Sequence, residues 1–490
     1  MSNSYHGLSR VDHLIKECLD GRAANVPFPN VFGRLLPENP LTGSLSDKTI
    51  RDAYIALADS MKTSTPKDGA AEAGMTFFGQ FVDHDITLDA QSAIGTKLDP
   101  RSIRNVRTPS LDLDNVYGDG PDGSPHLYSE KYDGYLLFGR KDNPLDLARN
   151  DRGRALIGDP RNDENIIVSQ IQGAFICLHN ILMTQVENKP DTKSDVHNCA
   201  TMNIRSTVWN DMIPGHLKDF EEVRRFIRLH YQYLVLHDLL PAFVDKKVVT
   251  AVLDHDPFHD LGPIMPVEFS GAAYRFGHAT VRPQYVLKDG GSPVELFTMR
   301  GFERRDHHSD VAFDHLFDLG NGKAQRAAPV GPAMAPSLFD LPFVTKGMKF
   351  LSLDLDVKEA KKLALRNILR DRGTYLLPSG QQVARTLGID ELAPPKPLTE
   401  HHVSKTPLWY YCLQEAGEKG GGRLTGVGGA IVASVFIRLL KLDPESVLHV
   451  PDFKPWSGFG GTGITVGKVM KFVEEHRGKI AHADELTSGN

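Results

Sequence analysis

The stretch GQFVDHD (residues 79–85) decides the fold, because polar side chains recur in it at helical spacing within apolar surroundings. In a helix, Gln80, Asp83 and His84 stand at i, i+3 and i+4, so an amide, a carboxylate and an imidazole share one face. Residues 75–78 just before it are mostly apolar, which places this helix in a core. Polar groups buried there cost free energy unless each has a partner. The stretch therefore predicts either a satisfied polar network or a ligand site.

The composition is that of an ordinary soluble enzyme. The 490 residues would allow roughly two to four domains by length alone, but no linker-like stretch divides the chain. Apolar residues make up 40% and charged residues 24%, with a net charge of -6. This balance gives no reason to expect nucleic acid or an anionic membrane as a partner.

The N-terminal residues 1–22 are polar and lack the basic start and apolar core of a secretory signal. The sequence therefore predicts a cytoplasmic protein, or one exported without a cleavable signal peptide. The longest apolar run, residues 426–440, contains Arg438 and several glycines and is too short to span a bilayer. We predict a buried helix there and no membrane span. The scattered cysteines are predicted to be reduced and mostly structural: Cys18, Cys177, Cys199 and Cys412.

Helical patterns dominate the rest of the chain. Residues 1–45, rich in proline, predict an extended N-terminal arm, and residues 46–480 one large domain. Ser46 is a candidate cap for a helix over residues 46–61. Strand signals are few and short, so the fold class is mainly α. Further helices are predicted over residues 158–186 with Asp159 as N-cap, 220–240 ending at Pro241, 272–281, 363–371, and 407–450 with a glycine-rich turn at 420–422.

Residues 89–150 contain no long helical pattern, and loops of that length are usually functional or held by a ligand. Between residues 108 and 114 oxygen-bearing side chains alternate with others, so an extended backbone would turn them to one side. They are Thr108, Ser110, Asp112 and Asp114. Calcium takes about six to eight oxygen ligands, so a cation site is one reading and a solvated acidic turn is the other.

Three further segments each carry a polar pair at i, i+3: Arg161 with Glu164, Arg275 with His278, and Asn367 with Arg370. Taken singly, these read as surface ion pairs or a satisfied buried histidine. Together with His84 they suit a haem between two imidazoles. One imidazole would bind the iron while its other nitrogen donates to an amide or a carboxylate. The second would move a peroxide proton beside a guanidinium.

Four motifs resemble, in order, those of the animal-type haem peroxidases of the peroxidase–cyclooxygenase superfamily, and look most like its bacterial branch. The resemblance runs from about residue 30 to residue 472, so it covers nearly the whole chain. It implies a single large helical domain around a central haem. The motifs are FGQFVDHD (78–85), LDLDNVYG (111–118), GDPRNDE (158–164) and YRFGH (274–278).

The resemblance also implies roles for single residues. It makes His84 the distal acid–base, Arg161 its catalytic partner, and Gln80 the amide that helps hold distal water or a halide. His278 matches the proximal iron ligand. Asn367 matches the hydrogen-bond partner of that ligand.

Other haem contacts follow from the same resemblance. Arg275 and Arg370 match contacts to the propionates or the haem edge. Asp83 and Glu164 match the carboxylates that become ester-linked to haem b through peroxide-driven autocatalysis. The chain departs from the myeloperoxidase type at Asn165, where that type has a Met joined to a haem vinyl as a sulfonium. Without this link, chloride is expected to be a poorer donor than bromide or iodide.

The resemblance assigns calcium to the acidic loop. Asp85, next to the distal histidine, matches a ligand. It would be joined by Thr108, by Ser110 through its carbonyl, by Asp112 and by Asp114. The ion would tie the loop to the helix that carries His84.

The activity implied is reduction of hydrogen peroxide and oxidation of small donors, namely bromide, iodide, thiocyanate and phenols, through a ferryl intermediate. One alternative is a fatty-acid dioxygenase, which needs a Tyr beside His and Trp in a short motif that this chain lacks. Another is a haem- and calcium-binding protein without turnover. The pair His84 and Arg161 argues against the second alternative, because haem retention needs neither residue.

Overall fold

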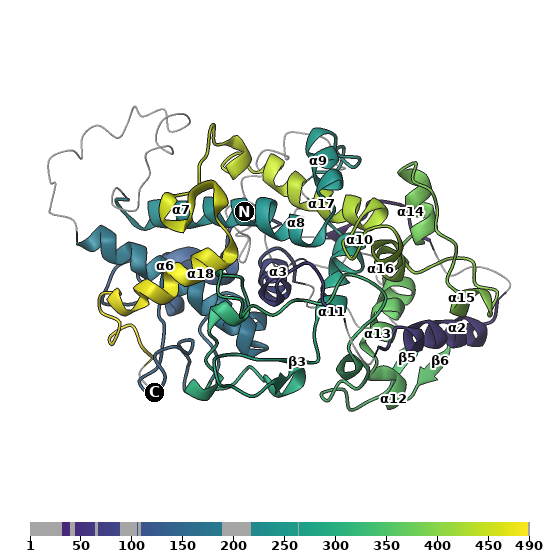
Figure 1. The fold of residues 1–490 in the computed structure, drawn as a ribbon, viewed down its shortest axis with the longest axis horizontal. Helices are drawn as coiled ribbons and strands as arrows, with labels where there is room; N and C mark the ends of the chain where they lie inside the picture. The colour runs from purple at the N-terminus through teal and green to yellow at the C-terminus, as the bar shows by residue number, and fades with distance from the viewer. Residues whose placement is uncertain are drawn as a thin grey trace, which may run out of the picture.

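The computed structural model describes residues 32–39, 45–63, 67–88, 105, 109–188, 217–262 and 264–488. The fold is mainly α, with few and short strands, as the sequence predicts (Figure 1). The longer helices are α2 (Asp47–Ser60), α3 (Ala73–Ile86), α6 (Ile166–Glu187), α7 (Phe220–Leu234), α9 (Lys246–Asp254), α13 (Leu363–Leu369), α14 (Gly380–Thr386), α16 (Leu408–Glu418), α17 (Gly426–Leu442) and α18 (Val466–His476).

Short elements connect these helices. The described strands form two-stranded sheets: β1 (Phe32–Gly33) parallel to β2 (Met265–Pro266), and, antiparallel, β3 (Gln284–Tyr285) with β4 (Val294–Glu295) and β5 (Met348–Phe350) with β6 (Leu353–Leu355). The short helices are α4 (Asp114–Tyr117), α5 (Gly120–Gly123), α8 (Leu240–Phe243), α10 (Val267–Ser270), α11 (Gly277–Thr280), α12 (Val357–Ala360) and α15 (Lys396–Thr399).

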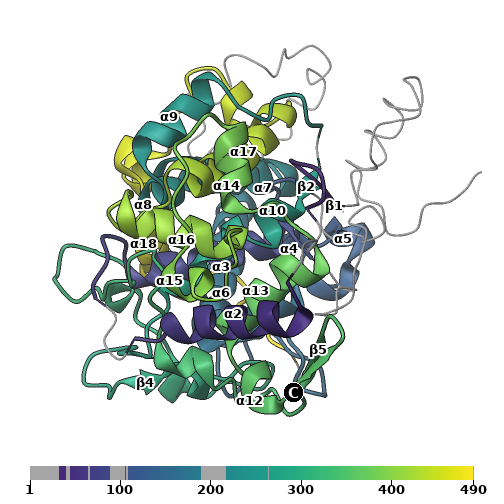
Figure 2. The ribbon, with the colours of Figure 1, turned by 90° about the vertical axis from the view of Figure 1, so that its right-hand side faces the viewer.

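Helix α3, which carries the stretch 79–85, lies in the middle of the molecule in both ribbon views (Figures 1 and 2). An aromatic cluster fixes its rotation. Phe81 stacks on Phe175 of α6 with ring centroids 4.8 Å apart, and Tyr231 of α7 meets Phe81 edge-on at 6.2 Å. Burying each ring stabilises the fold by about 1.5–3 kcal/mol. With the aromatic side packed, the polar face of α3 turns away from α6 and α7.

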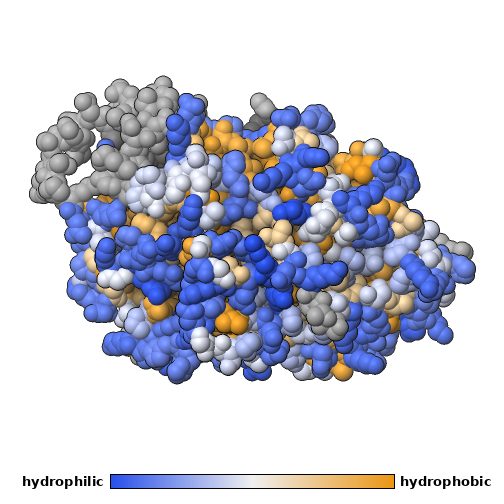
Figure 3. Space-filling view, in the orientation of Figure 1, coloured by the Kyte–Doolittle hydropathy of each residue, from blue (hydrophilic) through white to orange (hydrophobic). Residues whose placement is uncertain are grey.

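Two helix predictions are confirmed. The Ser46 hydroxyl caps α2 and accepts a bond from the Thr49 amide at 3.1 Å. The apolar run 426–440 forms α17, which is buried over most of its length. Among the described helices, α6 is the one long and apolar enough to cross a membrane, but 94% of its most apolar window is buried inside the protein. On the face seen in Figure 3, hydrophilic residues prevail.

The prediction of one helix over residues 158–186 is wrong. Asp159 does act as a cap, but of a 3-10 turn, η3 (Pro160–Asp163). Helix α6 then begins anew, and the Asn165 side chain accepts bonds from the amides of Ile167 and Val168. The break arises because two capping residues compete for one segment, and each starts its own turn.

The other helical segments also bend. Pro241 does not end the helix, because a π-turn, η5 (Val235–Leu239), places it in the first turn of α8, where no N–H bond is required of it. Residues 272–281 form a 3-10 turn, η6 (Ala273–Phe276), and then α11 rather than one helix. Helix α13 likewise passes into a second π-turn, η11 (Arg370–Thr374).

Most of the predicted arm, residues 1–45, lies outside the described residues. Within it, β1 pairs with β2, and the buried Glu268 accepts bonds from the amides of Leu35 at 3.0 Å and Leu36 at 3.2 Å. A buried carboxylate thus fastens this segment to the domain.

Candidate active site

A cavity of about 950 Å³ lies between α3 and the segment η6–α11. It brings together residues from three of the four motifs, including His84 and His278, and its walls are largely aromatic and aliphatic. The polar side chains that line it include Gln80, Asp83, His84, Arg161, Glu164, Asn165, Arg275, His278 and Arg300. The apolar ones include Phe77, Phe243, Phe276, Leu296, Phe297, Met299, Phe302, Leu341, Phe343 and Leu363.

His84 presents one ring nitrogen to the cavity. Its Nδ1 lies 2.7 Å from Oδ1 of Asn162, so Nδ1–H donates and Nε2 keeps its lone pair on the cavity side. Burial, and then the charge of Arg161, lower the pKa of His84 to about 4. The imidazole is therefore neutral near pH 7 and can accept a proton.

Arg161 is held beside His84 by its own turn. Its Nε and Nη2 donate to the buried carboxylate of Asp159, with the Nη2 bond at 2.7 Å. Nη2 also donates to the backbone carbonyls of His84, at 3.3 Å, and Thr87. These contacts fix the guanidinium where the cavity meets α3.

Gln80, Glu164 and Asn165 form a row of hydrogen bonds along the cavity wall. Gln80 donates through Nε2 to Glu164 and accepts at Oε1 from Asn165 at 3.2 Å. Burial raises the pKa of Glu164 to about 7. Asp83, one helical turn from Gln80, accepts a bond from the Thr87 hydroxyl at 3.0 Å. Two carboxyl groups thus border the cavity on the side of His84.

On the opposite side, the amide of Asn367 on α13 lies against Nδ1 of His278, with Nδ2 at 2.8 Å, and the oxygen and nitrogen of an amide exchange places when it is turned over. With the amide oxygen turned inward, Nδ1–H donates to it and Nε2 is left for a metal. Burial, and then the charges of Arg275 and Arg370, lower the pKa of His278 to about 3. The backbone carbonyl of Arg275 is held by the indole of Trp409 at 3.2 Å.

The donor set and the walls fit haem. A neutral imidazole backed by an amide is the arrangement that binds haem iron, and apolar walls suit the porphyrin faces. Arg275 in the lining and Arg370 near His278 suit the two propionates. Asn367 and Arg370 are not among the residues that line the cavity, and each acts on it through His278, which Asn367 contacts and whose pKa the charge of Arg370 lowers.

The acidic loop gathers three carboxylates. Ligand oxygens of Asp85, Asp112 and Asp114 all lie within 4.8 Å of one another. One Asp85 oxygen accepts bonds from the Tyr231 hydroxyl at 2.9 Å and the Leu113 amide at 3.3 Å. The other Asp85 oxygen is buried and has no hydrogen-bond partner among the described residues. Burial raises the pKa of Asp112 to about 6. Three carboxylates so close together, with Asp85 buried and Asp112 and Asp114 half-buried, fit a hard cation.

The predicted geometry of this loop is wrong. Leu113 has a left-handed backbone with φ of 62°, and Asp114 begins α4. The loop therefore curls around the carboxylates instead of extending past them. Ser110 is buried in the same loop, and Thr108 lies outside the described residues.

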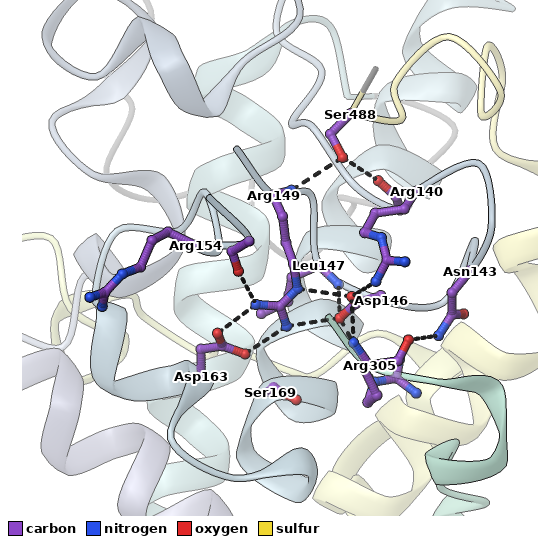
Figure 4. Close-up of polar contacts among 12 residues, drawn as sticks. Arg140, Asn143, Asp146, Leu147, Arg149, Arg154, Asp163, Ser169, Arg305 and Ser488 are labelled. Carbon is purple, nitrogen blue, oxygen red and sulfur yellow. Dashed lines mark hydrogen bonds and ion pairs between the residues drawn. The ribbon is translucent and has the colours of Figure 1, made fainter. Parts of the chain in front are cut away.

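Sequence reasoning missed a buried ionic cluster behind the turn η3, here called the Arg149 cluster: Arg140, Asp146, Arg149, Asp163 and Arg305 (Figure 4). Arg149 donates to both oxygens of Asp163, at 2.7 and 2.8 Å, and to both oxygens of Asp146. Arg140 and the Arg305 amide complete the shell of Asp146. The cluster fixes the residue that precedes Glu164.

Comparison with known proteins gives consistent results. A sequence model of the animal haem peroxidases matches residues 90–355, more than half of the chain. A peroxidase-like protein of Margaritifera margaritifera is 27% identical over 163 residues, which are 31% of this chain and 18% of that protein. The match thus spans less than a fifth of that relative.

Solved structures share the fold. Peroxidase A of Dictyostelium discoideum has a TM-score of 0.59 at 14% identity, over 92% of this chain and 94% of that chain. Fatty acid alpha-dioxygenase of Oryza sativa has a TM-score of 0.58 at 16% identity, over 93% and 80% of the two chains. The enzyme of that name from Arabidopsis thaliana scores 0.56 at 15% identity, over 92% and 77%.

Proposed function

Because the chain belongs to the animal haem peroxidase family, we propose that it is a peroxidase that reduces hydrogen peroxide and oxidises small anionic or phenolic donors. One observation carries the proposal. A buried neutral imidazole, His84, and a fixed guanidinium, Arg161, share a cavity with a second imidazole, His278, that is backed by an amide.

The residues divide the work between two sides of the cavity. His278 would hold haem b through its iron, and Arg275 and Arg370 would meet the propionates. Bound there, haem would supply the redox-active iron and the two electrons needed to break the O–O bond.

The proton moves through His84. Its Nε2 accepts a proton from hydrogen peroxide and returns it to the outer oxygen, which leaves as water. Arg161, held by Asp159, stabilises the negative charge on that oxygen as the bond breaks. Gln80, hydrogen-bonded to Glu164 and Asn165, would orient the incoming peroxide or halide.

A peroxide titration of the haem-loaded protein tests this function. We expect one equivalent of hydrogen peroxide to shift the Soret band within seconds, and phenol or iodide to restore it. Oxygen uptake with a long-chain fatty acid in the absence of peroxide, together with an unmoved Soret band, would assign the protein to the dioxygenases instead.

The cavity mouth and Asn165 bear on the donor. Phe302 and Phe343, both in the lining, are 48% and 69% exposed, an aromatic rim that suits phenols. Asn165 is engaged with Gln80 and cannot form a sulfonium with haem. We therefore expect bromide, iodide, thiocyanate and phenols to be turned over at least about tenfold faster than chloride near pH 7. Steady-state rates at matched donor concentrations measure this, and equal chloride and bromide rates contradict it.

Asp83 and Glu164 are the residues proposed to bond haem covalently. Both line the cavity, and the raised pKa of Glu164 leaves part of its carboxyl protonated near pH 7. After peroxide treatment, we expect acid–organic extraction to leave haem on the protein. Mass spectrometry of Asp83→Asn and Glu164→Gln should each show one link fewer. Complete release of unmodified haem from the wild-type protein would refute both links.

Calcium is the cation proposed for Asp85, Asp112 and Asp114, with Thr108 and Ser110 as further ligands. Chelation with EGTA should lower the Tm, since calcium at 100 times its dissociation constant stabilises a fold by about 2.7 kcal/mol. Asp112→Asn should lower the Tm and remove the response to calcium. The control is Asp122→Asn, at an exposed site in α5. An unchanged Tm on chelation and calcium addition would argue against the site.

A further inference from the structure

A chain of buried amides runs from His84 to a backbone carbonyl. Asn162 Oδ1 lies 2.7 Å from His84 Nδ1, and Asn162 Nδ2 donates to Gln172 Oε1 at 2.8 Å. Gln172 Nε2 then donates to the backbone carbonyl of Asn115 at 3.1 Å. Asn162, Gln172 and Asn115 are each fully buried.

The direction of this chain follows from its far end. A carbonyl oxygen only accepts hydrogen bonds, so Gln172 must turn its NH₂ group to Asn115 and its oxygen to Asn162. Asn162 must then turn its NH₂ group to Gln172 and its oxygen to His84. The imidazole therefore has to carry its hydrogen on Nδ1. Reversing either amide would set two oxygens or two NH₂ groups against each other away from water.

We propose that Asn162 and Gln172 are positioning residues that hold His84 in the tautomer with Nδ1–H inward and the Nε2 lone pair toward the cavity. The inference rests on the proposed function and deepens it, because only this tautomer can accept the peroxide proton at Nε2. When Nε2 takes that proton, the imidazolium still donates from Nδ1 to Asn162. Nε2 then gives the same proton to the outer peroxide oxygen, which leaves as water. The amides of Asn162 and Gln172 therefore transfer no proton.

The location of the amides supports a role directed at His84. Gln172 lies on α6 and Asn162 in the turn η3, so the chain joins two elements on either side of the helix break. Asn115 also donates through Nδ2 to the carbonyl of Phe81 on α3 at 3.0 Å. The far end of the amide chain is thus anchored to the helix that carries His84, so the amides and the imidazole are held in fixed relative positions.

The test compares Asn162→Leu, Gln172→Leu and the double variant. Gln170→Leu is the matched control, because Gln170 is a partly buried glutamine of α6 that takes no part in the amide chain. Its hydrogen-bond partners are Ile166, Ser309 and Val311. Stopped-flow measurement of the Soret band gives the second-order rate constant for hydrogen peroxide. A second mixing step gives the rate at which a phenol restores the band.

We expect Asn162→Leu to lower the peroxide rate constant by about 10- to 100-fold. Gln172→Leu should also lower this rate constant relative to the wild type. The double variant should match Asn162→Leu, since both act through one bond to His84. The donor step and haem content should stay unchanged, and Gln170→Leu should retain the wild-type rate constant. A structural role alone would not separate the two steps in this way.

Three results would overturn the inference: a wild-type peroxide rate in Asn162→Leu, losses that multiply in the double variant, or an equal loss in the donor step. If Asn162→Leu fails to bind haem, the rates of the peroxide step and the donor step in Gln172→Leu decide whether the inference holds. A wild-type protein whose Soret band ignores peroxide would instead refute the proposed function, so the two failures are distinguishable.

Discussion

Replacing His84 with leucine should lower the rate constant for hydrogen peroxide by about 10²–10⁴-fold, the usual contribution of a positioned acid–base group. Haem content should persist, because His278 and Asn367 lie on the other side of the cavity. The rate constant is measured by stopped flow on the Soret band, per mole of bound haem. Arg161 would remain, and it accounts for the residual rate that we expect.

The control for this variant is another buried histidine. Burial also lowers the pKa of His179 to about 4, but its ring contacts Tyr117 and the Gly134 carbonyl, away from the cavity. Provided that it folds, His179→Leu should keep the peroxide rate constant. In the wild-type protein that constant should be level near pH 7 and fall as the pH drops through about 4, where His84 becomes protonated. If the rate constant of His84→Leu fell at the same pH as that of the wild type, the assignment of this pH dependence to His84 would be contradicted.

The site was predictable where its chemistry is carried by side chains at short spacing. Gln80, Asp83 and His84 share a helix face by their spacing alone, and the structure places all three on the cavity. His278 and Asn367 meet although 89 positions separate them. Spacing could not give that contact, and only the resemblance between ordered motifs implied it.

The remaining parts depend on how separate elements meet. Asn162 lies within a motif, but its partner Gln172 is not identifiable from a pattern that predicts one helix over residues 158–186. In a continuous helix, positions 10 apart do not touch. The break after Glu164 brings Asn162 back along α6, where Gln172 reaches it at 2.8 Å. The left-handed Leu113 has the same effect in the acidic loop, because no helix or strand periodicity marks such a residue.

The Arg149 cluster places an unusual demand on the fold, because its charges are buried close to the turn η3. The side chains of Arg149, Asp146 and Asp163 are 2%, 0% and 3% exposed. Taking such charges out of water costs several kcal/mol each unless the partners satisfy them. Arg149 does so for both carboxylates at once, since its planar fork bonds each of them through two nitrogens.

Arg149→Met should therefore lower the free energy of unfolding by about 3–5 kcal/mol, because two carboxylates lose their main partner while still buried. Arg149→Lys should recover only part of this, since one ammonium cannot bond both carboxylates bidentately. Urea unfolding followed by circular dichroism measures the loss, and Arg152→Met, at an exposed neighbour, is the control. Asp163 lies between Asn162 and Glu164, so the Soret band of folded Arg149→Met should also shift. An unfolding free energy within about 1 kcal/mol of the wild type would mean that water replaces the guanidinium in the cluster.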